Sequence, residues 1–174
     1  MIDTSTLTIR EMDSEDVAAL AAAFADMGKT EEYFQRYWQE NLEKKRVTLV
    51  AELAGKIVGY VNVIWESEYE GFRDQGVPEI SDMNVIAPLR CQGIGTRMVS
   101  ACEQLVRGKG KRAIGIGVGI TSDYAIAQSL YPKLGYVPDG SGIHQDQWGG
   151  TTYSTKRLRE TCIGEPGRSA DPNR

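Results

Sequence analysis

Residues 80–96 read ISDMNVIAPLRCQGIGT, and this stretch decides the fold. The run Ile80 to Val85 is rich in β-formers and predicts a strand, and Pro88 forces the chain to turn after it. Glycines then open a helix that we expect to begin at Gln92 or Ile94 and to end near residue 107. A strand, a glycine turn and a helix in succession are typical of an α/β unit.

The turn before this helix has the properties of an anion site. A helix start leaves its first backbone N–H groups unpaired and carries partial positive charge. Gly93 and Gly95 would let a bulky anion reach those groups, because glycine has no Cβ. A pyrophosphate is therefore a sensible ligand, and a tight connection that binds nothing is the alternative. The Walker pattern is absent, and Met98 stands where the dinucleotide pattern requires its third glycine.

Strands and helices alternate around this unit. Before it, we expect strands at 6–10, 47–53 and 56–65, helices at 14–27 and 30–45, and a polar connection at 66–77. After it, we expect a strand at 113–120, a helix at 124–134, and weaker strands at 136–137 and 151–156. This pattern predicts one α/β or α+β domain with a mixed sheet over 1–159, followed by a polar tail over 160–174.

The composition excludes several classes of protein. Twenty basic and 24 acidic side chains give a net charge of −4, which argues against a nucleic-acid or anionic-membrane binder. Three cysteines without C-x-x-C spacing do not fit a disulfide framework, so we expect a cytoplasmic protein. We see no signal peptide and no apolar run near the ~20 residues that a membrane span needs. His144 is the only histidine and lacks clustered partners, so we expect no metal site.

Two motifs follow one another in this chain. Residues 90–95, Arg-Cys-Gln-Gly-Ile-Gly, match R/Q-x-x-G-x-G/A, and residues 127–136, AQSLYPKLGY, fit A-x-x-L-Y-x-x-x-G-F/Y. With both motifs, the chain resembles the GNAT superfamily of N-acetyltransferases over roughly residues 7–158. The resemblance implies a splayed, mostly antiparallel sheet flanked by helices. It also implies that the co-substrate is acetyl-CoA.

The resemblance places the co-substrate on particular residues. In the family, backbone N–H groups near the end of the motif strand bind the oxyanion, and these map to Met83, Asn84 and Val85. Many members carry an Asn three residues before the second motif's Ala that often contacts the cofactor; this chain departs from the pattern with Tyr124, which we keep as a candidate. The turn that would hold the pyrophosphate consists of Arg90, Cys91, Gln92, Gly93, Ile94, Gly95 and Thr96.

Acetyl transfer to an amine needs an acid and a base. Tyr131 occupies the family's acid position and can donate its phenol proton to the leaving thiolate. An alkylammonium has a pKa near 10.4 and must lose a proton before it attacks. Glu79, where histone-type relatives place a base, and Asp82 are the candidates, acting directly or through water. On a regular strand they would face opposite sides, so that at most one points into the site.

Two further features have open interpretations. Gly115, Gly117 and Gly119 would line one face of the strand at 113–120, where either the acyl-pantetheine arm or a packed helix could approach. The connection at 66–77 is acidic, which indicates either a solvated loop or a border of the acceptor site that attracts a cationic amine.

The expected function is transfer of an acetyl group from acetyl-CoA to a primary amine of a small molecule by direct attack. A peptide or protein amine is the second alternative as acceptor. A non-catalytic acyl-CoA-binding module is the alternative from another class. We expect no nucleic-acid or membrane partner, and a homodimer stays open because family members are often dimers.

Overall fold

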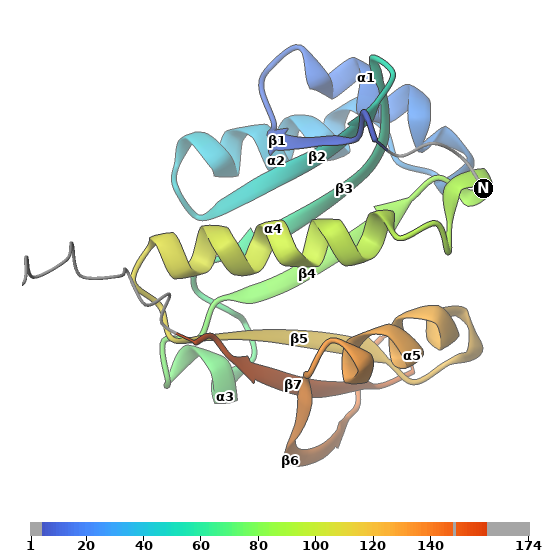
Figure 1. The fold of residues 1–174 in the computed structure, drawn as a ribbon. Helices are drawn as coiled ribbons and strands as arrows, with labels where there is room; N and C mark the ends of the chain where they lie inside the picture. Colours follow the sequence, from blue (N-terminus) through green and yellow to red (C-terminus); the bar gives the residue numbers. More distant parts are fainter. Residues whose placement is uncertain (1–4, 148, 160–174) are drawn as a thin grey trace, which may run out of the picture.

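The computed structural model describes residues 5–147 and 149–159. Its strands form one open sheet in the order β1-β2-β3-β4-β5-β7-β6 (Figure 1). Of the six pairings within it, β4 with β5 is parallel and the other five are antiparallel. The predicted mixed sheet is therefore confirmed. The tail predicted at 160–174 lies outside the described residues.

The elements follow one another closely along the chain. The strands are β1 (Thr8–Glu11), β2 (Arg46–Leu53), β3 (Lys56–Ile64), β4 (Glu79–Val85), β5 (Ala113–Gly119), β6 (Val137–His144) and β7 (Thr151–Arg157). The helices are α1 (Asp16–Ala23), α2 (Glu31–Leu42), α3 (Glu70–Arg73), α4 (Ile94–Gly108) and α5 (Ala125–Lys133). Short 3-10 turns lie at Ala25–Met27, Ala87–Leu89 and Ser122–Tyr124. No helix in this part of the chain is long and apolar enough to cross a membrane.

The structure departs from the predicted elements in two places. Helix α3 lies within the connection that we expected to be irregular, and its one turn buries Phe72, which is 1% exposed. Strand β6 extends through glycines and Pro138, where we expected only two strand residues. It is an edge strand, and proline is tolerated there because its missing N–H need not pair.

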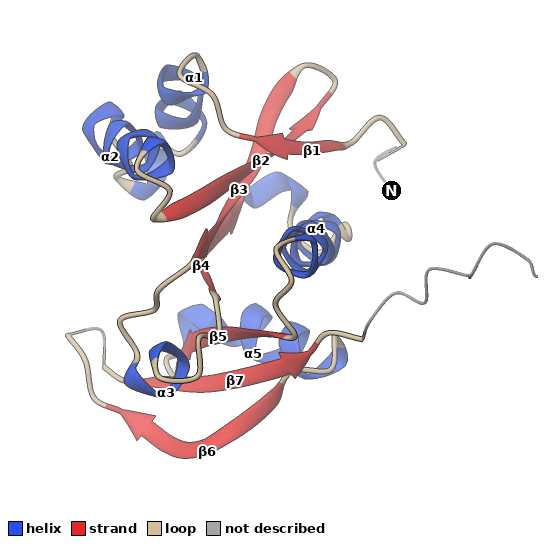
Figure 2. Ribbon diagram, turned by 90° about the vertical axis from the view of Figure 1, so that its left-hand side faces the viewer, coloured by secondary structure: helices blue, strands red, loops and turns tan. Residues whose placement is uncertain are grey.

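Helices cover both faces of the sheet. Figure 2 shows α1 and α2 on one side of β2 and β3, and α4 on the other. On the α1 and α2 side the core is built largely from aromatic side chains, with Phe24 and Phe34 each in edge-on contact with Tyr60. On the α4 side it is mainly aliphatic, with Ile80 and Met98 fully buried. Burial of these two apolar layers fixes which face each residue of β4 presents.

The sheet opens between β4 and β5. The two strands pair only where Glu79 meets Gly115 and Ile80 meets Ile116, at the start of β4. Beyond Ile80 the strands diverge (Figure 1), so the edge of β4 that faces β5 has no strand partner as far as Val85. The predicted splay is therefore confirmed, and it exposes backbone groups at the end of β4.

A bulge in β4 changes which side chains share a face. Asn62 pairs with Ser81 but Tyr60 pairs with Asn84, so β4 has one residue more than β3 here, with Asp82 in the left-handed region at φ 45°. The prediction that Glu79 and Asp82 face opposite sides is wrong for this reason. The bulge breaks the alternation, and both carboxylates lie on the face opposite α4.

Aromatic rings cover the glycines of β5. A Cβ at Gly115 would lie 2.4 Å from the ring of Phe72, and a Cβ at Gly119 would lie 2.4 Å from the ring of Tyr124. At Gly117 it would lie 2.8 Å from the ring of Tyr153. Helix α3 therefore packs on this face through Phe72, as one of the two interpretations expected, and aromatic rings from two further elements cover the rest of it.

Candidate active site

The turn between β4 and α4 presents a run of unpaired backbone donors. Gly93 is the N-cap of α4 at φ 84°, and no side chain caps the helix. From Cys91 to Thr96, no N–H group donates a hydrogen bond within the described residues, and the next, that of Arg97, donates to the Gly93 carbonyl. Space is open above Gly93, since a Cβ there would meet nothing within 4 Å. Such a run of N–H groups at a helix start suits a pyrophosphate.

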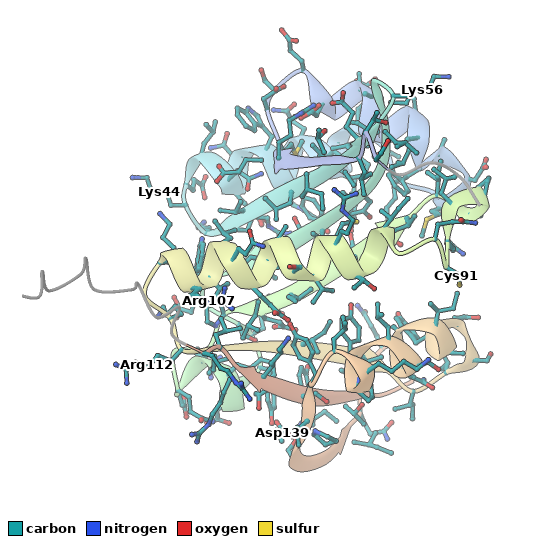
Figure 3. All side chains as sticks on the ribbon, in the orientation of Figure 1. Lys44, Lys56, Cys91, Arg107, Arg112 and Asp139 are labelled. Atoms are coloured by element: carbon teal, nitrogen blue, oxygen red, sulfur yellow. The ribbon has the colours of Figure 1, made fainter. Side chains whose placement is uncertain are left out.

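Neighbouring elements hold the turn in place. The Arg90 side chain donates from Nε to the Val85 carbonyl at 3.0 Å, which ties the turn to the end of β4. A Cβ at Gly95 would lie 3.6 Å from Met83 and 3.7 Å from Leu130, so the start of α4 meets both β4 and α5. Cys91 is exposed with φ 59°, and Figure 3 shows it at the start of α4. The predicted cofactor residues of β4 and those of the turn therefore lie next to one another in the structure.

The candidate acid lies on α5. Tyr131 is 4% exposed, and its ring contacts that of Tyr136 edge-on at 5.5 Å. Burial, with a smaller contribution from Cys102, raises the pKa of Tyr131, so the phenol holds its proton. Within the described chain no hydrogen bond reaches its hydroxyl, whereas the Tyr136 hydroxyl donates to Glu103 at 3.2 Å. Tyr131 therefore has a proton that is not engaged by the protein.

Tyr124 lies at the start of α5. Its side chain is 40% exposed and its ring packs on Gly119, at the end of β5. This is the β5 side of the opening between β4 and β5. The departure from the family pattern therefore replaces a small amide with an aromatic ring at the edge of that opening.

Glu79 is a partly buried carboxyl at the start of β4. The Ser67 hydroxyl donates to its Oε2 at 2.5 Å. Burial raises the pKa of Glu79, nearby Glu68 raises it further, and hydrogen bonds from Ser67 and the Gly117 backbone partly oppose both effects. No cationic side chain pairs with Glu79 in the described ranges. A carboxyl in this environment can accept a proton closer to neutral pH than an exposed one.

Asp82 has a contrasting environment. Its Oδ2 accepts hydrogen bonds from the phenols of Tyr33, Tyr37 and Tyr60 at 2.6, 2.8 and 2.9 Å. Its Oδ1 accepts from Asn84 Nδ2 at 2.8 Å, and Lys29 Nζ lies 3.4 Å from Oδ2. Both oxygens are therefore engaged by the protein itself. The cluster joins α2 to β3 and to the bulge of β4.

A cavity of about 510 Å³ lies beside Glu79. It is lined by Glu68, Tyr69, Glu70, Gly71, His144 and Tyr153. Its connection to Glu79 is Gly117, because a Cβ at that glycine would lie 2.8 Å from the ring of Tyr153 and 3.3 Å from Glu79 Oε1. The acidic connection therefore borders a cavity, and its interpretation as a border of the acceptor site stays a prediction.

Sequence reasoning did not identify the aromatic side chains of this cavity. Tyr69 and Tyr153 stack at 3.7 Å between ring centroids, although they come from the connection before β4 and from the last strand. The glycine alternation of β5 signalled that something approaches that face, but not which residues. Across the residues that the structure describes, no group of three His, Cys, Asp or Glu side chains could hold a metal ion.

Comparison with known proteins decides the family. The model of the acetyltransferase (GNAT) family matches residues 14–136, which include the turn and both predicted motifs. The chain belongs to this family. It is therefore an acyl-CoA-dependent N-acetyltransferase whose co-substrate is acetyl-CoA. A search of curated protein sequences finds no significant match.

Solved structures of acetyltransferases share this fold. An N-acetyltransferase from Staphylococcus aureus Mu50 is 19% identical with a TM-score of 0.70, covering 89% of this chain and 100% of its own. A ribosomal-protein-alanine N-acetyltransferase from Brucella melitensis is 23% identical with a TM-score of 0.71, covering 87% and 99%. The yncA protein from Salmonella typhimurium, solved with its cofactor acetyl-CoA, is 22% identical with a TM-score of 0.68, covering 92% and 99%.

A single added negative charge tests whether the turn before α4 binds coenzyme A. Gly93→Asp should raise the Kd for coenzyme A at least about tenfold, because it places a carboxylate among the donors that would hold the pyrophosphate. Gly110→Asp is the matched control, since Gly110 also has positive φ and open space but follows the other end of α4. Isothermal titration calorimetry measures both variants, with thermal unfolding to confirm the fold. Equal affinities would remove this turn from the binding site.

Proposed function

We propose that this acetyltransferase transfers the acetyl group of acetyl-CoA to a primary amine of a small molecule by direct attack. The observation that carries the proposal is Glu79, a partly buried carboxyl with a raised pKa that lies between the opening of the sheet and the cavity. Such a group can take the ammonium proton on the acceptor's side, directly or through one water. The environment of Glu79 fits the role of a base better than the role of a structural carboxylate.

The donor side would use the turn and the end of β4. We assign the pyrophosphate to the N–H groups from Cys91 to Thr96 and to the guanidinium of Arg90. Acetyl-CoA, when bound, supplies the thioester carbonyl. The edge of β4 beyond Ile80 has no partner on β5, so backbone donors of Met83, Asn84 or Val85 on that edge can bind the developing oxyanion. We place Tyr124 at the β5 side of the same opening.

The proton on Tyr131 would complete the reaction. Its raised pKa keeps the phenol protonated at neutral pH, and its hydroxyl has no hydrogen-bond partner within the described residues. We assign it the donation of a proton to the departing coenzyme A sulfur. Asp82 is assigned a positioning role instead of that of a base, because three phenols, Asn84 and Lys29 surround its oxygens.

The cavity supports a small molecule as acceptor. Its volume of about 510 Å³ lies within the usual range for small-ligand pockets, about 300–1,000 Å³. Structures with this fold include the ribosomal-protein-alanine enzyme and an aminoglycoside 6'-N-acetyltransferase complexed with coenzyme A, 17% identical with a TM-score of 0.64. Fold likeness therefore does not choose between acceptors, and a peptide amine is the second candidate.

A product screen tests this function. The protein is incubated with acetyl-CoA and either small primary amines or short peptides, and both thiol release and acetylated products are measured. We expect thiol release with small amines and a mass increase of one acetyl group in the amine. Release only with peptides would select the second candidate. Binding of acetyl-CoA without release on either panel would indicate a non-catalytic module.

Tyr131→Phe should lower kcat by roughly 100-fold if the phenol protonates the leaving group. The KM for the amine should change little, because the ring remains. Tyr136→Phe is the control, since it removes the adjacent phenol, which is bound to Glu103. Steady-state kinetics on both variants decides the point, and a loss under about threefold in Tyr131→Phe would leave it only a packing role.

Glu79→Gln should remove the acidic limb of the pH–rate profile and lower the kcat/KM plateau by about 100-fold or more. In the wild type, kcat/KM should fall as pH drops through the raised pKa of Glu79, because a protonated carboxyl cannot accept the amine's proton. A profile that keeps the same limb in the variant would contradict the assignment.

The same substitution has a stability readout that does not depend on turnover. A carboxyl whose pKa is raised by folding binds its proton more tightly in the folded state, so it destabilises the fold as pH rises through that pKa. Glu79→Gln should therefore raise Tm at pH values above the raised pKa, and the gain should shrink near pH 4, where both states of the wild type are protonated.

A further inference from the structure

The cavity beside Glu79 has a rigid aromatic wall. Tyr69 and Tyr153 stack with their ring planes 4° apart, and His144 lies edge-on to both at 5.0 and 5.3 Å. The Tyr69 hydroxyl donates to Asp139 on β6 at 2.6 Å, which fixes the outer ring to the sheet edge. Tyr153 is fixed in turn by its position over Gly117. The rings are thus set in place without any ligand.

The carboxylates around this cavity lack cations of their own. Glu68 and Glu70 form no ion pair within the described residues, and neither does Glu79. Arg73, in the same helix as Glu70, donates instead to the Glu68 backbone carbonyl at 3.1 Å. Burial raises the pKa of Glu79 and Glu68 raises it further; burial, together with Glu79 and Glu68, also raises the pKa of Tyr153.

The buried and half-buried carboxylates elsewhere in the described residues are paired. Asp16 has Arg10 at 2.7 Å, Glu103 has Lys156 at 2.8 Å, and Asp82 has Lys29 at 3.4 Å. Of the described carboxylates that are buried or half-buried, Glu79 alone has no ion pair, and the exposed Glu68 and Glu70 near it have none either. Carboxylates without ion pairs around a cavity are an environment that attracts an organic cation.

We infer that the acceptor is a small dication, with the reacting amine over Glu79 and a second cationic nitrogen between Glu68, Glu70 and the Tyr69–Tyr153 rings. This inference rests on the proposed function and names its substrate class. The acceptors that fit are diamines and longer polyamines.

A second nitrogen would have a role that the reacting nitrogen cannot fill. The reacting ammonium gives one proton to Glu79, and the neutral amine then forms the N–C bond as the C–S bond breaks. The sulfur takes the proton of Tyr131, the nitrogen loses its second proton to the Tyr131 phenolate through water and becomes a neutral amide, and Glu79 returns its proton to solvent. That nitrogen cannot neutralise Glu68 and Glu70 throughout the reaction. A second nitrogen stays charged before and after transfer, so it can hold the acceptor while the first one reacts.

Matched amines test the inference. Straight-chain α,ω-diaminoalkanes of increasing length are each compared with the monoamine of the same carbon chain. We expect the best diamine to have a KM at least about tenfold lower than its monoamine, with similar kcat. Above the raised pKa of Glu79, the double variant Glu68→Gln, Glu70→Gln should raise the diamine KM by a similar factor and change the monoamine KM by less than about threefold. Glu66→Gln, an exposed glutamate of the same connection outside the cavity lining, should change neither.

Direct binding separates this inference from the proposed function. Calorimetry of the preferred diamine with the wild type and the double variant should show binding that the variant weakens about tenfold, whether or not turnover occurs. Diamines and monoamines with equal KM, unaffected by the double variant, would overturn the dication inference while leaving small-amine acetylation intact. If no amine causes thiol release, but the diamine binds the wild type and not the double variant, the proposed function would be overturned and the cation site supported.

Discussion

One extra residue in β4 governs the arrangement of the candidate site. Asp82 occupies the left-handed region, which is costly for a residue with a Cβ, and four side-chain donors on its carboxylate hold it there. The bulge lets Ile80 stay buried against α4 while Glu79 and Asp82 share the opposite face. It also directs β4 towards the turn that begins α4. Because β4 bends at this fixed point, the bulge sets the positions of the helix start, the opening of the sheet and the cavity relative to one another.

The two carboxylates of β4 illustrate how surroundings assign roles to identical groups. Asp82 is surrounded by phenols, an amide and an ammonium, so it anchors α2 and the bulge. Glu79 has one hydroxyl and one backbone donor, an adjacent glutamate and little water, which favours its protonated form. These different surroundings support the roles that we propose, with Glu79 in proton transfer and Asp82 in positioning.

Sequence reasoning predicted the parts that depend on local chemistry. The strand, the glycine turn and the helix from 80 to 107 were readable because glycine and proline have strong local preferences. The bulge could not be predicted, because it depends on how β3 pairs with β4 and no residue type indicates its position. Helix α3 was too short for any periodicity, and its existence follows from burial of Phe72. The cavity was invisible because Tyr69 and Tyr153 meet only once β5 and β7 have paired.

The bare backbone of β5 has a consequence for how such a protein can change over evolutionary time. Because Gly115, Gly117 and Gly119 contribute no side chains, the wall over this strand is made by rings from α3, from β7 and from the turn before α5. These elements are encoded separately and reach the strand from different directions. None of the three rings belongs to the apolar layer beneath α4, so a change in one of them leaves the packing of that layer intact.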